Sequence, residues 1–236
     1  MVYFSIMKKI IILLNLIVII MLVAASPAFP QANIFSVAPG AEGQLSALLN
    51  KPALVRPAAA TSLGRNWFRL ETDAHVITDQ VSVRQVVAVL LDIENQARYF
   101  DGRRSKITTS VVSRSSSETI VDYVTIAIVP VVNIQLRTPY RASVRTVTNT
   151  DTSFALDIRQ LAQDSETNTK MKNLYAPRYV QEVTINGRNY TYIRIYSIVD
   201  IDMSILALGA KNTLENNAGP TNEEALQMII TAARSK

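Results

Sequence analysis

The chain has 236 residues, of which 48% are apolar and 18% charged, a composition that excludes disorder throughout and gives one domain enough chain to bury a core. Its 24 basic and 19 acidic side chains are interleaved and form no continuous basic stripe, so nucleic acid is not an expected partner. The absence of cysteine excludes disulfide bonds and thiolate metal sites. A mild attraction to an anionic membrane surface stays open.

The N-terminus has the order of segments typical of a secretory signal. Lys8 and Lys9 precede the apolar run 10–23, and small residues follow over 24–28. The run is shorter than the ~20 apolar residues that a helix needs to cross a bilayer, which favours a cleavable signal peptide over residues 1–28. We expect cleavage after Ala28, with Ala32 as the alternative, and export to the periplasm or the extracellular medium. The other interpretation is an uncleaved signal anchor that tethers the domain to the membrane surface.

Residues 29–64 are rich in Ala and Pro and are predicted to form a linker arm. Pro39, Gly40, Pro52 and Pro57 interrupt any long regular element in this segment. The folded domain is expected over residues 65–236.

The domain is predicted to begin with one strand and two short helices. Phe68, Leu70 and Val76 alternate with polar residues, as in a half-buried strand. Ser82 and Gln85 have the spacing of a capping box, and the apolar residues behind them recur on one helical face: Val83, Val86, Val87, Leu90 and Leu91. A second helical turn is expected over residues 95–100.

A period of two then continues for most of the remaining chain and predicts an antiparallel meander. The expected strands are 106–114, 119–129, 133–148, 153–163, 179–185 and 190–203. Asn186 and Gly187 predict a type I′ turn, because both residues tolerate positive φ. Gly219 and Pro220 precede a capping box at Thr221, which predicts that a closing helix begins there.

This order of elements resembles the START-like, or SRPBCC, superfamily. The local resemblance is carried by Val86, Leu90, Asp92 and Ile93 in the first helix, then by Tyr99, Phe100 and the strand 106–114. The resemblance covers residues 65–236 and implies an α+β helix-grip fold. In that fold a curved antiparallel sheet of about seven strands surrounds a long C-terminal helix, and two short helices follow strand one. It also implies an apolar cavity between sheet and helix, which in relatives takes up lipids, sterols or polyketides.

The candidate cavity residues are those that strand and helix periodicity assigns to the buried side. Asp122 is the best candidate for a polar cavity group, because it lies among residues expected to face inward; the alternative is that it reaches solvent. The full set of ligand-cavity candidates is Asp122, Val124, Ile126, Leu136, Tyr140, Phe154, Leu156, Ile193, Ile195, Leu226 and Ile230. Each apolar member is equally well explained as filled core.

The sequence contains no recognisable catalytic motif, and no catalytic residue, metal ligand or cofactor is predicted. Its one histidine, His75, is expected on the surface, and Asp200 is expected in solvent at a strand end. The favoured hypothesis is an exported, non-catalytic protein that binds a hydrophobic ligand such as a lipid. Two alternatives stay open: a cyclase-like or hydrolase-like enzyme with polar groups near Asp122 and Tyr140, and an envelope interaction module with a collapsed cavity. Enzymatic activity is therefore uncertain and less favoured.

Overall fold

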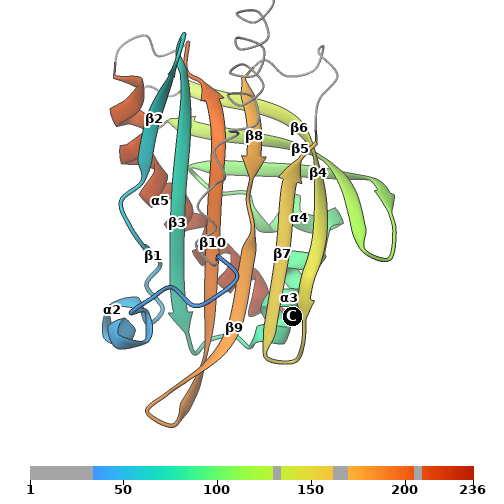
Figure 1. The fold of residues 1–236 in the computed structure, drawn as a ribbon. Coiled ribbons are helices and arrows are strands. Elements are labelled where there is room, and N and C mark those ends of the chain that lie inside the picture. The colour runs from blue at the N-terminus through green and yellow to red at the C-terminus, as the bar shows by residue number, and fades with distance from the viewer. Residues whose placement is uncertain (1–33, 130–133, 162–169, 205–208) are drawn as a thin grey trace, which may run out of the picture. The chain divides into compact units, whose positions relative to one another are not determined.

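The computed structural model describes residues 34–129, 134–161, 170–204 and 209–236, so the predicted signal peptide lies outside the described residues. One antiparallel sheet of ten strands dominates the fold (Figure 1), in the order β1-β3-β10-β8-β7-β6-β5-β4, with β2 paired to β3 and β9 paired to β10 and β7. The strands are β1 (Ala53–Leu54), β2 (Ala59–Gly64), β3 (Trp67–Thr78), β4 (Ser105–Arg114), β5 (Glu118–Val129), β6 (Ile134–Asn149), β7 (Ser153–Gln160), β8 (Met171–Tyr175), β9 (Arg178–Ile185) and β10 (Arg188–Asp202). The helices are η1 (Glu42–Gln44), α2 (Leu45–Leu48), α3 (Val83–Leu91), η2 (Ile93–Asn95), α4 (Gln96–Tyr99) and α5 (Ala210–Ala233).

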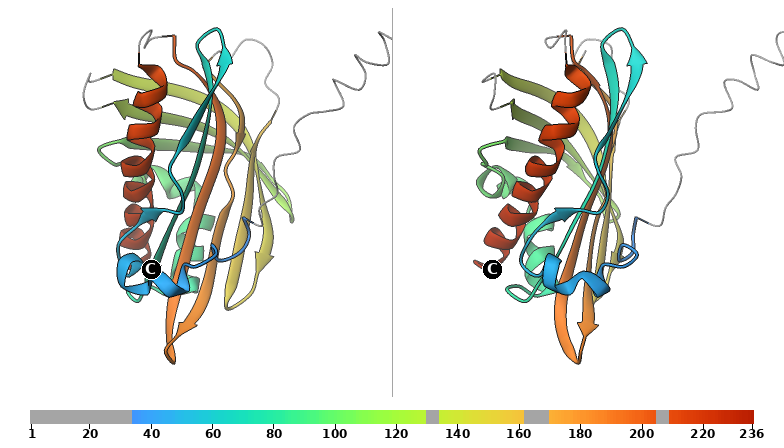
Figure 2. Two further views of the ribbon diagram at one scale, coloured as in Figure 1. Left: turned by 60° about the vertical axis from the view of Figure 1, so that its left-hand side comes forward. Right: turned by 90° about the vertical axis from the view of Figure 1, so that its left-hand side faces the viewer.

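The sheet has two faces that are covered by different segments. Helices α3, α4 and α5 lie on one face, called the inner face below, and residues 34–44 cross the opposite, outer face (Figure 2). The main core lies between the inner face and the helices, where Val121, Ala142 and Ile195 of the sheet pack with Leu226 and Ile230 of α5. A second cluster lies on the outer face, where Leu48 of the N-terminal segment packs with Ile77 and Tyr192.

The six strands predicted for the meander are present within a few residues of the expected limits. Asn186 and Gly187 both have positive φ, 53° and 75°, which confirms the turn between β9 and β10. The sheet has ten strands rather than about seven. Two of the additional strands, β1 and β2, come from residues 29–64, which the sequence predicts to be a linker, and β8 is a short strand between β7 and β10.

Helix α5 begins earlier than the sequence predicts. The expected start is Thr221, but the helix runs from Ala210 and contains Pro220, although proline lacks the N–H that the helical ladder needs. The predicted capping box does not form, since Thr221 lies inside the helix. The Glu224 carboxylate accepts hydrogen bonds from the backbone N–H groups of Arg103 and Arg104 instead, both at 2.9 Å.

Helix α3 carries the predicted capping box between Ser82 and Gln85 and ends at Asp92. The Asp92 carboxylate accepts hydrogen bonds from the Tyr99 hydroxyl, from Asn95 Nδ2 at 2.8 Å and from Lys236 Nζ at 2.9 Å. These donors lower the pKa of Asp92 to about 2, with the Tyr99 hydrogen bond the largest cause. Asp92 thereby joins the end of α3 to α4 and to the C-terminus.

Substituting Asp92→Asn is expected to lower the free energy of unfolding by about 1 kcal/mol at pH 7, a value discounted for solvent screening. The Asp92 pKa is depressed in the folded state, so its contribution is present above the ordinary aspartate pKa and is lost as the pH falls through about 2. Urea titrations of both proteins at pH 7 and near pH 2 measure this difference. A loss of stability that is the same size at both pH values would contradict the assignment.

Candidate functional site

The inner face brings together most of the residues that the sequence predicts for a ligand cavity. Phe154 and Leu156 of β7 and Ile193 and Ile195 of β10 all belong to the buried cluster beneath α5, and Tyr140 packs against it. On the helix side, Leu226 and Ile230 are at most 1% exposed. Candidates from three strands and from α5 therefore share one surface.

Strand β5 has the opposite orientation to the one expected. Val121 and Tyr123 belong to the inner cluster, so the alternation of a strand directs Asp122, Val124 and Ile126 to the outer face. Asp122 forms an ion pair there with Arg141, and their side chains are 45% and 51% exposed. This corrects the expected position of all three residues. Asp122 and Tyr140 thus lie on opposite faces and cannot converge on one substrate, as the enzyme hypothesis requires.

The backbone of Leu136 pairs with Ala127 in the β5–β6 ladder, but the Leu136 side chain lies outside the described part of the structure. Its membership of the candidate set stays a prediction.

The burial of the inner-face side chains decreases along β5 and β6. Val121 and Ala142 are fully buried, whereas Thr125 and Tyr140, on the same face of the same two strands, are only partly buried. Tyr123 and Tyr140 stack with their ring centroids 5.1 Å apart and their planes 10° apart. The Thr125 hydroxyl donates to the Tyr140 hydroxyl at 3.4 Å. Burial raises the pKa of both tyrosines, so both rings stay neutral hydroxyl donors at physiological pH.

Arg178 is a cationic group on this same surface. It opens β9 and pairs with Leu156 of β7 and with Ile195 of β10, and both of these partners face inward. Its Nη1 donates to the carbonyls of Ala176, Pro177 and Tyr196 at 3.0, 3.0 and 3.2 Å. Burial lowers the pKa of Arg178, and the neighbouring hydroxyls of Tyr140 and Tyr123 act in the opposite direction.

The sequence does not reveal Arg178 or Tyr123 as site residues. The strand containing Arg178 is predicted to begin one residue later, at Tyr179, and Tyr123 is placed on the outer face by the reversed alternation of β5. One observation could have placed Tyr123 on the inner face. Tyr123 pairs with Tyr140 across β5 and β6, so the two side chains lie on the same face once the register is known.

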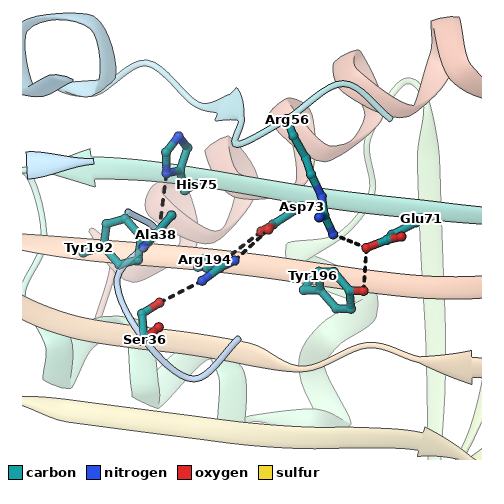
Figure 3. Close-up of polar contacts among 9 residues, drawn as sticks. All are labelled: Ser36, Ala38, Arg56, Glu71, Asp73, His75, Tyr192, Arg194 and Tyr196. Carbon is teal, nitrogen blue, oxygen red and sulfur yellow. Dashed lines mark hydrogen bonds and ion pairs between the residues drawn. The ribbon is translucent and has the colours of Figure 1, made fainter. Parts of the chain in front are cut away.

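The outer face of β3 and β10 carries a second, buried polar cluster (Figure 3). Arg194 donates to both carboxylate oxygens of Asp73, at 2.8 and 2.7 Å, and these two side chains are 5% and 4% exposed. His75, expected on the surface, is buried beside this pair, and burial lowers its pKa. Asp200, expected in solvent, is also buried and receives two hydrogen bonds from Arg69.

The N-terminal segment explains why Arg194 and its neighbours Asp73 and His75 are buried. The Ser36 carbonyl accepts from Arg194 Nη1 at 3.1 Å, and the Ala38 N–H donates to the Tyr192 hydroxyl at 2.9 Å (Figure 3). Burial raises the pKa of Tyr192 to about 12. The segment therefore acts as a cover that is hydrogen-bonded to β10.

Tyr192→Phe should loosen this cover. The substitution leaves the Ala38 N–H without its buried acceptor, which costs about 1–3 kcal/mol. We expect faster proteolysis before residue 50 and faster hydrogen exchange at Ala38, with smaller changes in α5. Tyr190→Phe on the same strand, whose hydroxyl makes no hydrogen bond to the described residues, is the matched control. Equal protection of Ala38 in both variants would contradict the role of the Tyr192 hydroxyl.

The described residues contain no cluster of three or more His, Asp or Glu side chains able to hold a metal ion. They also contain no helix that combines the length and the apolar character of a membrane span.

Comparison with solved structures finds similar folds. A STAR-related lipid transfer protein from Xanthomonas axonopodis gives a TM-score of 0.50 at 7% identity, covering 76% of this chain and 99% of that chain. The human StarD13 lipid transfer and protein localization domain gives 0.50 at 10% identity, covering 75% and 89%. A Thermus thermophilus protein gives 0.51 at 11% identity, covering 70% and 97%. No family model and no curated protein matches the sequence. Together with the long α5 against the inner face of the sheet, these likenesses confirm that the chain has the START-like fold.

Proposed function

We propose that this chain is an exported, non-catalytic binding protein for a hydrophobic ligand, such as a lipid, held between the inner face of the sheet and α5. The observation that carries the proposal is the incomplete burial of the inner face around Tyr140, Thr125 and Arg178, in a fold whose neighbouring inner-face residues are fully buried. A fully packed core would leave no accessible surface at these positions.

The composition of this surface also suits an apolar ligand. It combines the partly buried apolar side chains of Val111 and Ile158 with a few polar groups, the Tyr140 hydroxyl and the Arg178 guanidinium. Ligand sites are mostly apolar with a small number of polar groups that fix orientation. Two of the solved structures with a similar fold are named as lipid transfer proteins.

Ligand binding is tested with the purified full-length protein. Native mass spectrometry is expected to show a mass increment that disappears after delipidation. The delipidated protein should then enhance the fluorescence of the neutral apolar probe N-phenyl-1-naphthylamine, and 1-dodecanol should displace the probe. No increment and no saturable probe binding would contradict the proposal.

A pair of variants locates this binding on the inner face. Thr125→Trp fills the partly buried inner surface and is expected to weaken probe binding by roughly 10-fold or more, because it removes the space the probe occupies. Thr108→Trp, on the exposed outer face of β4, is the matched control and should bind the probe like the parent. Equal affinity of the two variants would remove the inner face as the binding surface.

The proposal of export is tested separately. The protein expressed in its own host should be recovered from the periplasm or the medium with Phe29 as its first residue. Recovery in the membrane fraction with residues 1–28 still attached would favour the signal anchor instead.

A further inference from the structure

The guanidinium of Arg178 has an unfilled hydrogen-bonding edge. Arginine carries five N–H donors, of which the two on Nη1 are directed to the carbonyls of Ala176, Pro177 and Tyr196. Across the described residues, Nε and Nη2 donate no hydrogen bond, and no carboxylate forms an ion pair with the group. Three donors of a positively charged, partly buried side chain, two of them on the Nε–Nη2 edge, are therefore left without an acceptor among the described residues.

The same edge is filled in three other arginines of this molecule. Arg69, Arg141 and Arg194 each use Nε and Nη2 to bind both oxygens of an aspartate, at 2.7–2.9 Å. This is the bidentate geometry that makes arginine suited to carboxylates and phosphates. Arg178 presents the same pair of donors, but on the inner face, where the described residues supply no acid.

This edge is not completely closed off from solvent. Every fully closed-off side-chain nitrogen or oxygen among the described residues has a hydrogen-bond partner. The Nε and Nη2 atoms of Arg178 have none, so they retain accessible surface even though burial lowers the pKa of the group. The stacked rings of Tyr123 and Tyr140 lie near enough to Arg178 to act on its pKa. The Tyr123 hydroxyl also makes no hydrogen bond within the described part of the chain.

The cost of the arrangement points to a ligand. A desolvated charge with unfilled donors is destabilising unless a partner compensates it. Here the surrounding surface is apolar, with Leu156 and Ile195 on either side of Arg178. A molecule that fills this place needs an anionic end for the guanidinium and an apolar part for the surface around it.

We infer that the ligand is an anionic amphiphile whose carboxylate or phosphate group binds the Nε–Nη2 edge of Arg178, with the hydroxyls of Tyr123 and Tyr140 beside it. This inference rests on the proposed function and names the chemical class of its ligand. The apolar chain of the amphiphile lies along the inner face beneath α5.

The test compares three unbranched compounds with the same number of carbon atoms: dodecanoate, dodecyl phosphate and 1-dodecanol. Each is used to displace N-phenyl-1-naphthylamine from the delipidated full-length protein at pH 7.5. At least one anion is expected to bind roughly 10-fold to 100-fold more tightly than the alcohol, because hydrogen bonds to a charged partner are the strong ones. The anion that shows the larger preference identifies the head group as carboxylate or phosphate.

Arg178→Met should bind the alcohol like the parent and lose the preference for the anion. Arg178→Lys keeps the charge but lacks the planar Nε–Nη2 pair of donors, so it should retain a reduced preference for the anion. If the methionine variant does not fold, the lysine variant provides the test in its place. Arg141→Met, which removes an exposed Nε–Nη2 pair on the outer face, should keep the full preference.

Two results would overturn the inference while the proposed function stands: equal affinity of anions and alcohol in the parent, or an anion preference that survives in Arg178→Met. If none of the three compounds displaces the probe, or the probe does not bind, the proposed function fails and the inference fails with it.

Discussion

Replacing Asp73 with alanine is expected to lower the free energy of unfolding by about 3–5 kcal/mol. Arg194 and Asp73 are 5% and 4% exposed and are joined by two hydrogen bonds, so the substitution leaves a buried guanidinium without its counter-charge. For a domain of this size the loss corresponds to a melting temperature roughly 6–20 °C lower, measured by differential scanning calorimetry.

Two further variants make the Asp73 prediction specific. Asp101→Ala breaks the exposed pair with Lys106 and should change the stability by less than about 1 kcal/mol. The double variant Asp73→Leu, Arg194→Met removes both charges and should recover much of the loss, because an apolar pair of similar volume carries no desolvation penalty. A single Asp73 variant as stable as Asp101→Ala would show that the buried pair does not stabilise the covered face.

Val121→Lys and Val124→Lys are expected to differ strongly, although the two residues lie three apart on the same strand. Val121 is fully buried on the inner face, so lysine there loses the apolar contacts of valine and buries an unpaired ammonium, at a cost on the order of 5 kcal/mol. Val124 lies on the outer face and is only partly buried, so its lysine reaches water and should cost about 1 kcal/mol or less.

Urea unfolding of the two lysine variants measures this contrast. The Val121 variant is expected to be unfolded or to unfold at a much lower urea concentration than the parent. Equal losses in both variants, or a larger loss at Val124, would contradict the orientation of β5 on which the position of Tyr123 depends.

The buried face of strand β6 can be predicted from its sequence, whereas the buried face of strand β5 cannot. In β6 the polar residues Arg141, Ser143 and Arg145 alternate with Tyr140, Ala142 and Val144, so period two assigns the buried face without other knowledge. In β5 apolar residues occur at both parities, and only the pairing of Val121 with Ala142 decides which of them face α5.

The buried polar cluster escapes sequence-based prediction for a different reason. A strand that alternates apolar and charged residues normally exposes its charged face, and β3 follows this pattern through Asp73 and His75. Here the charged face is covered by residues 34–44, far from β3 in sequence, which no local pattern reveals. At α5, likewise, the Glu224 carboxylate that the sequence assigns to a capping box binds backbone groups about 120 residues away, which no local pattern reveals.

Photolabelling with a neutral apolar probe tests the central claim most directly, because it reports where a ligand lies without depending on Arg178. A diazirine derivative of dodecanol, bound to the full-length protein and photolysed, should label peptides containing Tyr123, Tyr140 or Leu226, and unlabelled dodecanol should suppress the labelling. Labelling confined to outer-face residues such as Val124, or labelling that does not saturate, would contradict a hydrophobic ligand held between the sheet and α5.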